Sequence, residues 1–239
     1  MKKILMVMMF AVATATSAKA QLFIGGSLGF DYMASSETAG STTVNGPALT
    51  YIDVSPMAGF YLSDKFAVGA RGSFGMGITN YRQDGDKSTK YSSSKWGVEP
   101  FARLSVVNVG EFSLFLEGGV PFSGVSTEAT QGSTTKKGYS VSEFGVRILP
   151  ILSYELTDNL SLEMRPNLLR LGFSMATVTH PDNDDYKQSV TNFGFGVNSS
   201  AIRSSVNKAL LLDDAVYDFG NCDLFAALPL LEIGIVFKF

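Results

Sequence analysis

The chain has 239 residues, of which 45% are hydrophobic and 17% are charged, and its formal net charge is −3. This acidic balance argues against a nucleic-acid-binding protein, because contact with phosphate backbones requires a basic surface. The single cysteine, Cys222, cannot form an intramolecular disulfide, which excludes a fold held together by disulfide bonds.

The amino terminus has the pattern of a secretion signal. Lys2 and Lys3 precede a run of ten apolar residues, 4–13, and Ala18 and Ala20 are small residues at the spacing of a signal-peptidase site. The apolar run is too short for a membrane-spanning helix, which needs roughly 20 residues. We therefore expect residues 1–20 to be a signal peptide, with the mature chain beginning at Gln21. Residues 21–239 then hold 16 basic and 22 acidic residues, a net charge of −6.

The rest of the chain alternates between apolar and polar residues, although its mean hydropathy is +0.15 and it has no second long apolar run. Alternation with period two is typical of strands. The clearest case begins at Phe66, where every second residue up to Ile78 is apolar or small. We predict strands at 22–33, 50–62, 66–80, 94–106, 112–125, 140–156 and 160–175, and a last strand ending at Phe239. Five prolines inside these ranges are expected to mark bulges or strand ends: Pro56, Pro100, Pro121, Pro150 and Pro166.

Short and long connections alternate between these strands. The short ones, 63–65, 107–111 and 157–159, have the composition of tight turns. The long polar stretches are 34–49, 81–93, 126–139 and 176–187. Transmembrane barrels of the outer membrane have short periplasmic turns and long extracellular loops, whereas a soluble β-sandwich has no reason to sort its loops in this way. We predict an all-β fold, an up-and-down antiparallel transmembrane β-barrel of eight strands.

Within the last 50 residues of the chain, only the carboxy-terminal segment has a clear strand pattern. Ile235, Phe237 and Phe239 fall on one face of a strand at the carboxy terminus and resemble the signal by which outer-membrane barrels are recognised for assembly. Residues 199–229 lack barrel alternation and form an atypical insertion, although 190–197 alternate like a strand. Either the eighth strand is interrupted by this insertion, or the barrel has ten strands.

Charged residues occur at strand positions that face away from the lipid. In a narrow barrel they must pair, because an unpaired buried ion costs several kcal/mol. The favoured interpretation is an ion-paired interior that stiffens the barrel, and the alternative is a charged pathway for ions or protons. This predicted network consists of Asp31, Asp53, Arg71, Glu99, Arg103, Glu117, Glu143, Arg147, Glu163, Arg165 and Glu232.

Candidates for catalysis or metal binding are few. The one histidine, His180, lies near acidic residues and could serve a lipid-modifying enzyme at the membrane rim, but a solvated loop histidine is the favoured interpretation. Residues 182–185 lack the spacing of a calcium loop, and no G-x-S-x-G motif is present. We expect no catalytic residue, no metal and no cofactor.

Four segments together resemble a family. The signal with its cleavage site at 18–21 (AKAQ), the strand 25–30 (GGSLGF), the hairpin 56–68 and the terminal 235–239 (IVFKF) are similar to outer-membrane β-barrel domain proteins common in Bacteroidetes. These are often labelled porin-family proteins and resemble small barrels of the OmpA and OmpX type. The resemblance implies a non-enzymatic protein of the cell outer membrane whose partners are membrane lipids, the barrel-assembly machinery and extracellular ligands of the loops. It also leaves open a small porin-like channel for ions or solutes.

Overall fold

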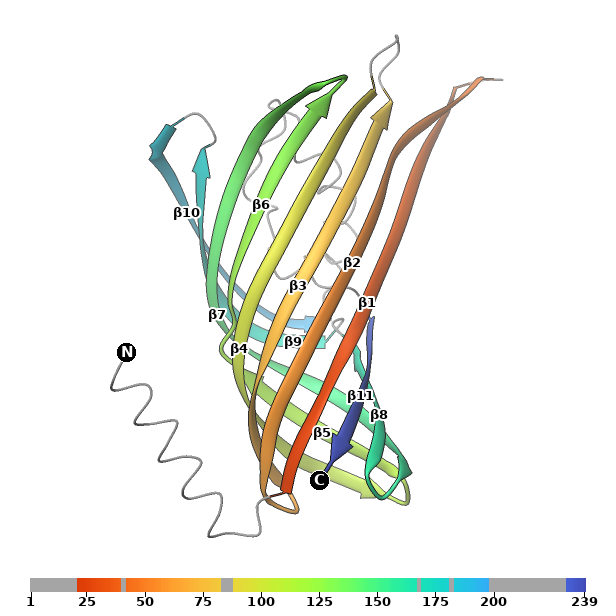
Figure 1. The fold of residues 1–239 in the computed structure, drawn as a ribbon, viewed down its shortest axis with the longest axis vertical. Helices are drawn as coiled ribbons and strands as arrows, with labels where there is room; N and C mark the ends of the chain where they lie inside the picture. Colours follow the sequence, from red (N-terminus) through yellow and green to blue (C-terminus); the bar gives the residue numbers. More distant parts are fainter. Residues whose placement is uncertain (1–20, 40–41, 83–87, 167–168, 181–182, 198–230) are drawn as a thin grey trace.

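The computed structural model describes residues 21–39, 42–82, 88–166, 169–180, 183–197 and 231–239. These residues form one antiparallel sheet that curls into an elongated barrel (Figure 1). None of the described residues belongs to a helix that is long and apolar enough to cross a membrane. The strand segments are β1 (Gln21–Ala39), β2 (Thr42–Ser63), β3 (Phe66–Arg82), β4 (Ser88–Val109), β5 (Phe112–Gly119), β6 (Phe122–Gln131), β7 (Thr134–Thr157), β8 (Leu160–Pro166), β9 (Leu169–His180), β10 (Asn183–Val197) and β11 (Leu231–Lys238).

The sheet closes into a ring in its lower half, where the short turns lie. In this half each strand pairs antiparallel with the next in the order β1, β2, β3, β4, β5, β7, β8 and β11, and β11 returns to β1. The closing pairs run from Phe23 opposite Lys238 to Gly29 opposite Glu232. The predicted antiparallel barrel is confirmed, and its lower ring consists of eight strands.

Three tight turns join strands at this end, which we call the turn end. They connect β2 to β3, β4 to β5 and β7 to β8, as the sequence predicts. Gly110 takes a φ of +58° in the second of these turns, a conformation that favours glycine. The carboxy terminus lies at the same end (Figure 1).

Several strands are interrupted halfway up the barrel. β4 and β7 pair with β5 in the lower half and with β6 above it, and the break between these two segments falls at Val120 and Pro121. β7 likewise pairs first with β8, which ends at Pro166, and then with β9. Two of the prolines expected at strand ends therefore mark real interruptions.

β10 and β11 together follow the course of an eighth strand. β10 pairs with β9, and β11 pairs with β8, both antiparallel. β10 ends at Val197 opposite Leu169, and β11 begins at Leu231 opposite Pro166. This arrangement agrees with an interrupted eighth strand rather than with a ten-stranded barrel. The predicted insertion 199–229 lies outside the described residues.

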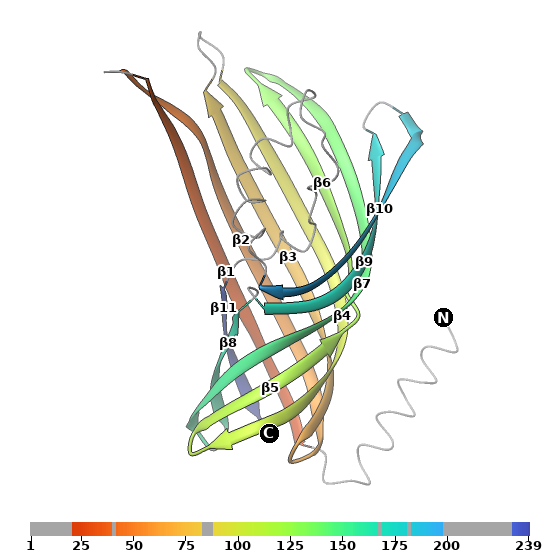
Figure 2. The same ribbon diagram turned by 180° about the vertical axis from the view of Figure 1, so that it is seen from behind.

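The described residues of the four long polar stretches belong mostly to strands rather than to loops, which corrects the expectation from the sequence. The strands continue through them, so that β1 reaches Ala39, β2 begins at Thr42, and β6 and β7 are joined by a turn at Gly132 and Ser133. Figures 1 and 2 show these hairpins rising well above the lower ring. Their strands escape a search for alternation because polar residues occupy both faces. We call this end of the barrel the hairpin end.

Apolar side chains lie on the outside of the barrel and charged side chains lie inside, the reverse of their usual distribution in a soluble protein. Large apolar side chains with a high exposed fraction cover the outside of the wall, including Leu28 at 63%, Met76 at 67% and Ile233 at 54%. The side chains buried inside include arginines, glutamates and serines. This distribution is what alternation produces when one face of the sheet meets an apolar medium and the other meets a polar interior.

Candidate functional site in the barrel interior

The interior at the turn end is filled by an apolar cluster. Phe23, Met57, Ala67, Phe101 and Val236 are buried there, and Tyr61 packs against them. The two phenylalanine rings lie against glycines of neighbouring strands. A Cβ atom on Gly59 would lie 2.5 Å from the ring of Phe23, and one on Gly69 would lie 2.7 Å from the ring of Phe101. The missing side chains therefore make room for a floor of aromatic rings across the barrel.

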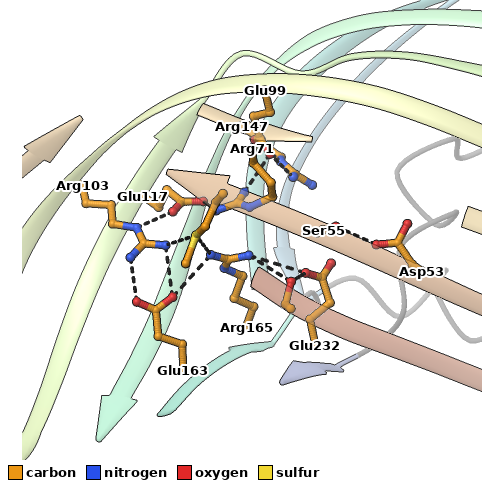
Figure 3. A network of polar contacts seen from close by, with 12 residues as sticks. Asp53, Ser55, Arg71, Glu99, Arg103, Glu117, Arg147, Glu163, Arg165 and Glu232 are labelled. Carbon is orange, nitrogen blue, oxygen red and sulfur yellow. Dashed lines mark hydrogen bonds and ion pairs between the residues drawn. The ribbon is translucent and has the colours of Figure 1, made fainter. Parts of the chain in front are cut away.

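A chain of ion pairs begins above this floor (Figure 3). Arg147 of β7 donates two hydrogen bonds to Glu99 of β4, from Nε to Oε1 at 2.7 Å and from Nη2 to Oε2 at 2.5 Å. Arg71 of β3 donates from Nη1 to Glu99 at 2.8 Å and from Nη2 to Glu117 at 2.6 Å. Two glutamates and two arginines from four strands are thus joined by hydrogen-bonded ion pairs.

The chain continues through a second set of pairs. Arg103 donates from Nε to Glu117 at 2.6 Å and from Nη1 to Glu163 at 2.7 Å. Arg165 lies 3.4 Å from Glu163 and 3.6 Å from Glu232. Ser27 Oγ donates to Glu232 at 2.8 Å, which brings the chain to β1. Each of these side chains is buried, and Arg103 is only 1% exposed.

Met57 and the aromatic rings support the arginines from below. The Met57 sulfur lies 3.3 Å from Nη2 of Arg103 and 3.1 Å from Nη2 of Arg165. The guanidinium carbons of Arg71 and Arg103 lie 4.9 and 5.0 Å from the centre of the Phe101 ring. Cation–π contacts of this kind stabilise a cation that has lost its water. The aromatic floor and the ion pairs therefore form one packed layer.

Four arginines and four glutamates alternate along this chain, so its formal charges cancel. The planar guanidinium suits such an arrangement because it binds two carboxylates in different directions at once. Removal of one member would leave an uncompensated charge in a buried place, a defect that costs about 3–5 kcal/mol in proteins. The ion-pair chain thus depends on all of its members.

A cavity lies directly above the chain, towards the hairpin end. It is partly open to solvent, and its lining includes Arg71, Lys95, Glu143, Arg147 and Glu232. Beside it, Asp53 is fully buried and accepts a hydrogen bond from Ser55 at 2.7 Å. The charged layer therefore separates this cavity from the aromatic floor.

The structure brings most of the residues of the predicted network together. Eight of them form the ion-pair chain, Asp53 and Glu143 lie beside it, and the side chain of Asp31 lies outside the described residues. Sequence reasoning missed Lys95, although it lies on the same face of β4 as Glu99 and Arg103. It also missed Met57 and Ser27, whose polar contacts no charge pattern reveals.

The other candidates for chemistry do not enter this site. The side chains of His180 and of residues 182–185, and the whole of Cys222, lie outside the part of the structure that is described. Within the described part, no group of three or more histidine, cysteine or acidic side chains could hold a metal ion.

Comparison with known proteins gives only distant likenesses. No protein-family model matches the chain, and no curated protein matches it. A solved major outer membrane protein from Thermus thermophilus is similar at 14% identity, with a TM-score of 0.42 over 92% of this chain and 99% of that chain. Neisserial surface protein A is similar at 11% identity, with a TM-score of 0.36 over 92% of this chain and 99% of that chain. The barrel fold of the present chain follows from its own strand pairings.

Proposed function

We propose that this chain is an integral protein of the outer membrane. The support comes from the apolar outer wall, because exposed apolar side chains run from Phe66 to Met76 on β3 and from Trp96 to Val106 on β4. Such spans match the roughly 9–11 residues with which a tilted strand crosses a bilayer. Residues 1–20 would direct the chain across the inner membrane, and the last strand would engage the barrel-assembly machinery.

Within that membrane we propose a non-enzymatic role as a closed barrel that holds polar hairpins outside the cell. The observation that carries this role is the unbroken chain from Arg147 to Glu232, packed on an aromatic floor. An open channel needs a continuous column of water, whereas here arginines and glutamates occupy the cross-section with hydrogen bonds to one another. The hairpins would then interact with extracellular ligands, in place of the long loops expected from the sequence.

Conductance across a planar bilayer tests this role. We expect the refolded mature protein to produce no conductance steps, with folding verified by its altered mobility in an unheated gel. We expect the double variant Arg103→Ala with Glu163→Ala to conduct, because it removes one buried ion pair together with the side chains that fill the cross-section there. The control is Lys136→Ala on the tip of the β6–β7 hairpin, which should stay silent. Reproducible steps from folded wild-type protein would overturn the closed barrel and establish a small channel.

A further inference from the structure

The outer wall changes character above a row of aromatic side chains. Trp96, Phe122 and Phe144 point outward from β4, β6 and β7, with exposed fractions of 57%, 43% and 40%. The rings of Phe122 and Phe144 lie 5.0 Å apart, and Trp96 covers Gly124, where a Cβ would lie 2.6 Å from the indole nitrogen. Aromatic residues take this position at the boundary between hydrocarbon and headgroups. This row therefore marks the headgroup level at the hairpin end.

Hydroxyl groups occupy positions above the aromatic row. Ser94 pairs with Ser126, Ser126 with Ser140, Ser140 with Thr179, and Thr179 with Lys187, so that one row of side chains crosses five strands. Ser94 lies two residues beyond Trp96, or about 7 Å along the strand. Ser126 and Ser140 lie four residues beyond Phe122 and Phe144, or about 13 Å along their strands. Across these five strands the row offers many hydrogen-bond donors and acceptors and no large apolar group, and it ends at β3, where Met76 stands opposite Ser94.

Lysines stand within and just above this row of hydroxyls. Lys187 lies in the row, Lys137 lies above it opposite Glu128, and Lys90 lies above it opposite Thr130. All three lysines are exposed. Among the outward side chains that the structure describes at this height on β4, β6 and β7, Glu128 is the one acid, and the side chains of residues 183–186 in β10 lie outside the described part. Three lysines and one acid are thus described here, on a chain whose residues 21–239 carry a formal net charge of −6.

We infer that this surface binds the phosphorylated saccharide head of a glycolipid in the outer leaflet. The hydroxyls suit a sugar, the lysines suit phosphate groups, and the aromatic row below places the lipid chains beside the apolar wall. The inference rests on the proposed position in the outer membrane but not on whether the barrel is closed. The glycolipid-binding surface is defined by Ser94, Ser126, Ser140, Thr179, Lys90, Lys137 and Lys187.

Native mass spectrometry of the refolded mature protein in neutral detergent tests this inference. We expect diphosphoryl lipid A to stay bound at least tenfold more tightly to the wild type than to the triple variant Lys90→Gln, Lys137→Gln and Lys187→Gln. The matched control, Lys65→Gln with Lys136→Gln, changes one lysine at the turn end and one at a hairpin tip, and should bind as the wild type does. Dephosphorylated lipid A and phosphatidylglycerol should bind weakly to all three proteins.

Two results would overturn the inference. One is equal binding of diphosphoryl lipid A to the wild type and the triple variant, and the other is equally tight binding of phosphatidylglycerol. Gel mobility of unheated samples shows that each variant has folded. Conductance measured on the same preparations keeps the two proposals apart, because conducting wild-type protein would refute the closed barrel and leave the lipid comparison intact.

Discussion

At the scale of single residues, Arg103 holds the centre of the ion-pair chain. It is 1% exposed and donates hydrogen bonds to both Glu117 and Glu163. We expect Arg103→Met to lower the free energy of unfolding by about 3–5 kcal/mol, because the methionine fills space but leaves two buried carboxylates without their shared cation. Urea unfolding of the protein refolded in lipid vesicles measures this loss.

A second substitution shows whether the loss comes from the unpaired charge. Glu117 keeps Arg71 and Glu163 keeps Arg165, so Arg103→Met leaves one buried negative charge in excess. Adding Glu163→Gln removes that excess, and the double variant should recover part of the lost stability. If Arg103→Met unfolds with the same free energy as a surface variant such as Lys136→Met, the ion-pair chain does not contribute to stability.

The glycines of the aromatic floor allow a prediction of the opposite kind, in which an added group destabilises. A Cβ on Gly59 would lie 2.4 Å from the carbonyl oxygen of Val68 as well as 2.5 Å from the Phe23 ring. Gly59→Ala should therefore destabilise the barrel by about 1–3 kcal/mol, as overpacking of a core does. Gly118→Ala is the control, because nothing lies within 4 Å of its added Cβ. Equal unfolding midpoints for the two variants would contradict the packed floor.

At the scale of elements, the eighth strand is continuous in direction but not in sequence. Odd-numbered residues point outward both in β10, where Phe193 is 72% exposed, and in β11, where Leu231 is 42% exposed. Opposite the gap, two residues separate Pro166 from Leu169. A single residue between Val197 and Leu231 would keep this alternation, and it would lie opposite the two residues between Pro166 and Leu169 in a β-bulge. The chain has 33 residues at this place instead of one.

Deletion of residues 199–230 tests this interpretation of the strand. The shortened chain keeps residue 198 as the single link, and we expect it to fold into a barrel with the gel shift and unfolding midpoint of the full chain. Deleting residue 198 as well should be much more damaging, because it reverses the alternation and turns Glu232 towards the lipid. Equal stability of the two deletions would show that β10 and β11 are independent elements.

At the scale of the whole molecule, the sequence predicts the lower ring well and the hairpin end poorly. In the lower ring the outward face of the strands is apolar, and the inward face carries the charged, polar and small side chains together with the aromatic floor, so alternation identifies strands such as 66–80 almost to their ends. Above the aromatic row both faces are polar, as in Ser88–Ser94, and the pattern disappears although the backbone pairing continues. The inward charged residues can be identified from their odd or even position along each strand. Which arginine pairs with which glutamate depends on the stagger between neighbouring strands, and the local sequence pattern does not reveal that stagger.

A substitution in the carboxy-terminal strand distinguishes an effect on the stability of the folded barrel from an effect on its assembly in cells. Phe239 is 68% exposed, and its backbone nitrogen donates a hydrogen bond to the carbonyl oxygen of Leu22 at 2.8 Å. Alanine keeps that bond, so Phe239→Ala should refold in vitro with an unchanged unfolding midpoint. In cells the same variant should reach the outer membrane in much smaller amounts, because the assembly machinery would read the terminal ring.

Phe112→Ala is the matched control for this prediction. Phe112 is 62% exposed at the same end of the barrel, but it lies in β5 rather than at the terminus. Its loss should leave the amount of protein in the outer membrane close to that of the wild type, measured by heat-shifted protein in membrane fractions. If both variants accumulate equally, the terminal phenylalanine serves the folded barrel as any other exposed ring does, and recognition must depend on the strand as a whole.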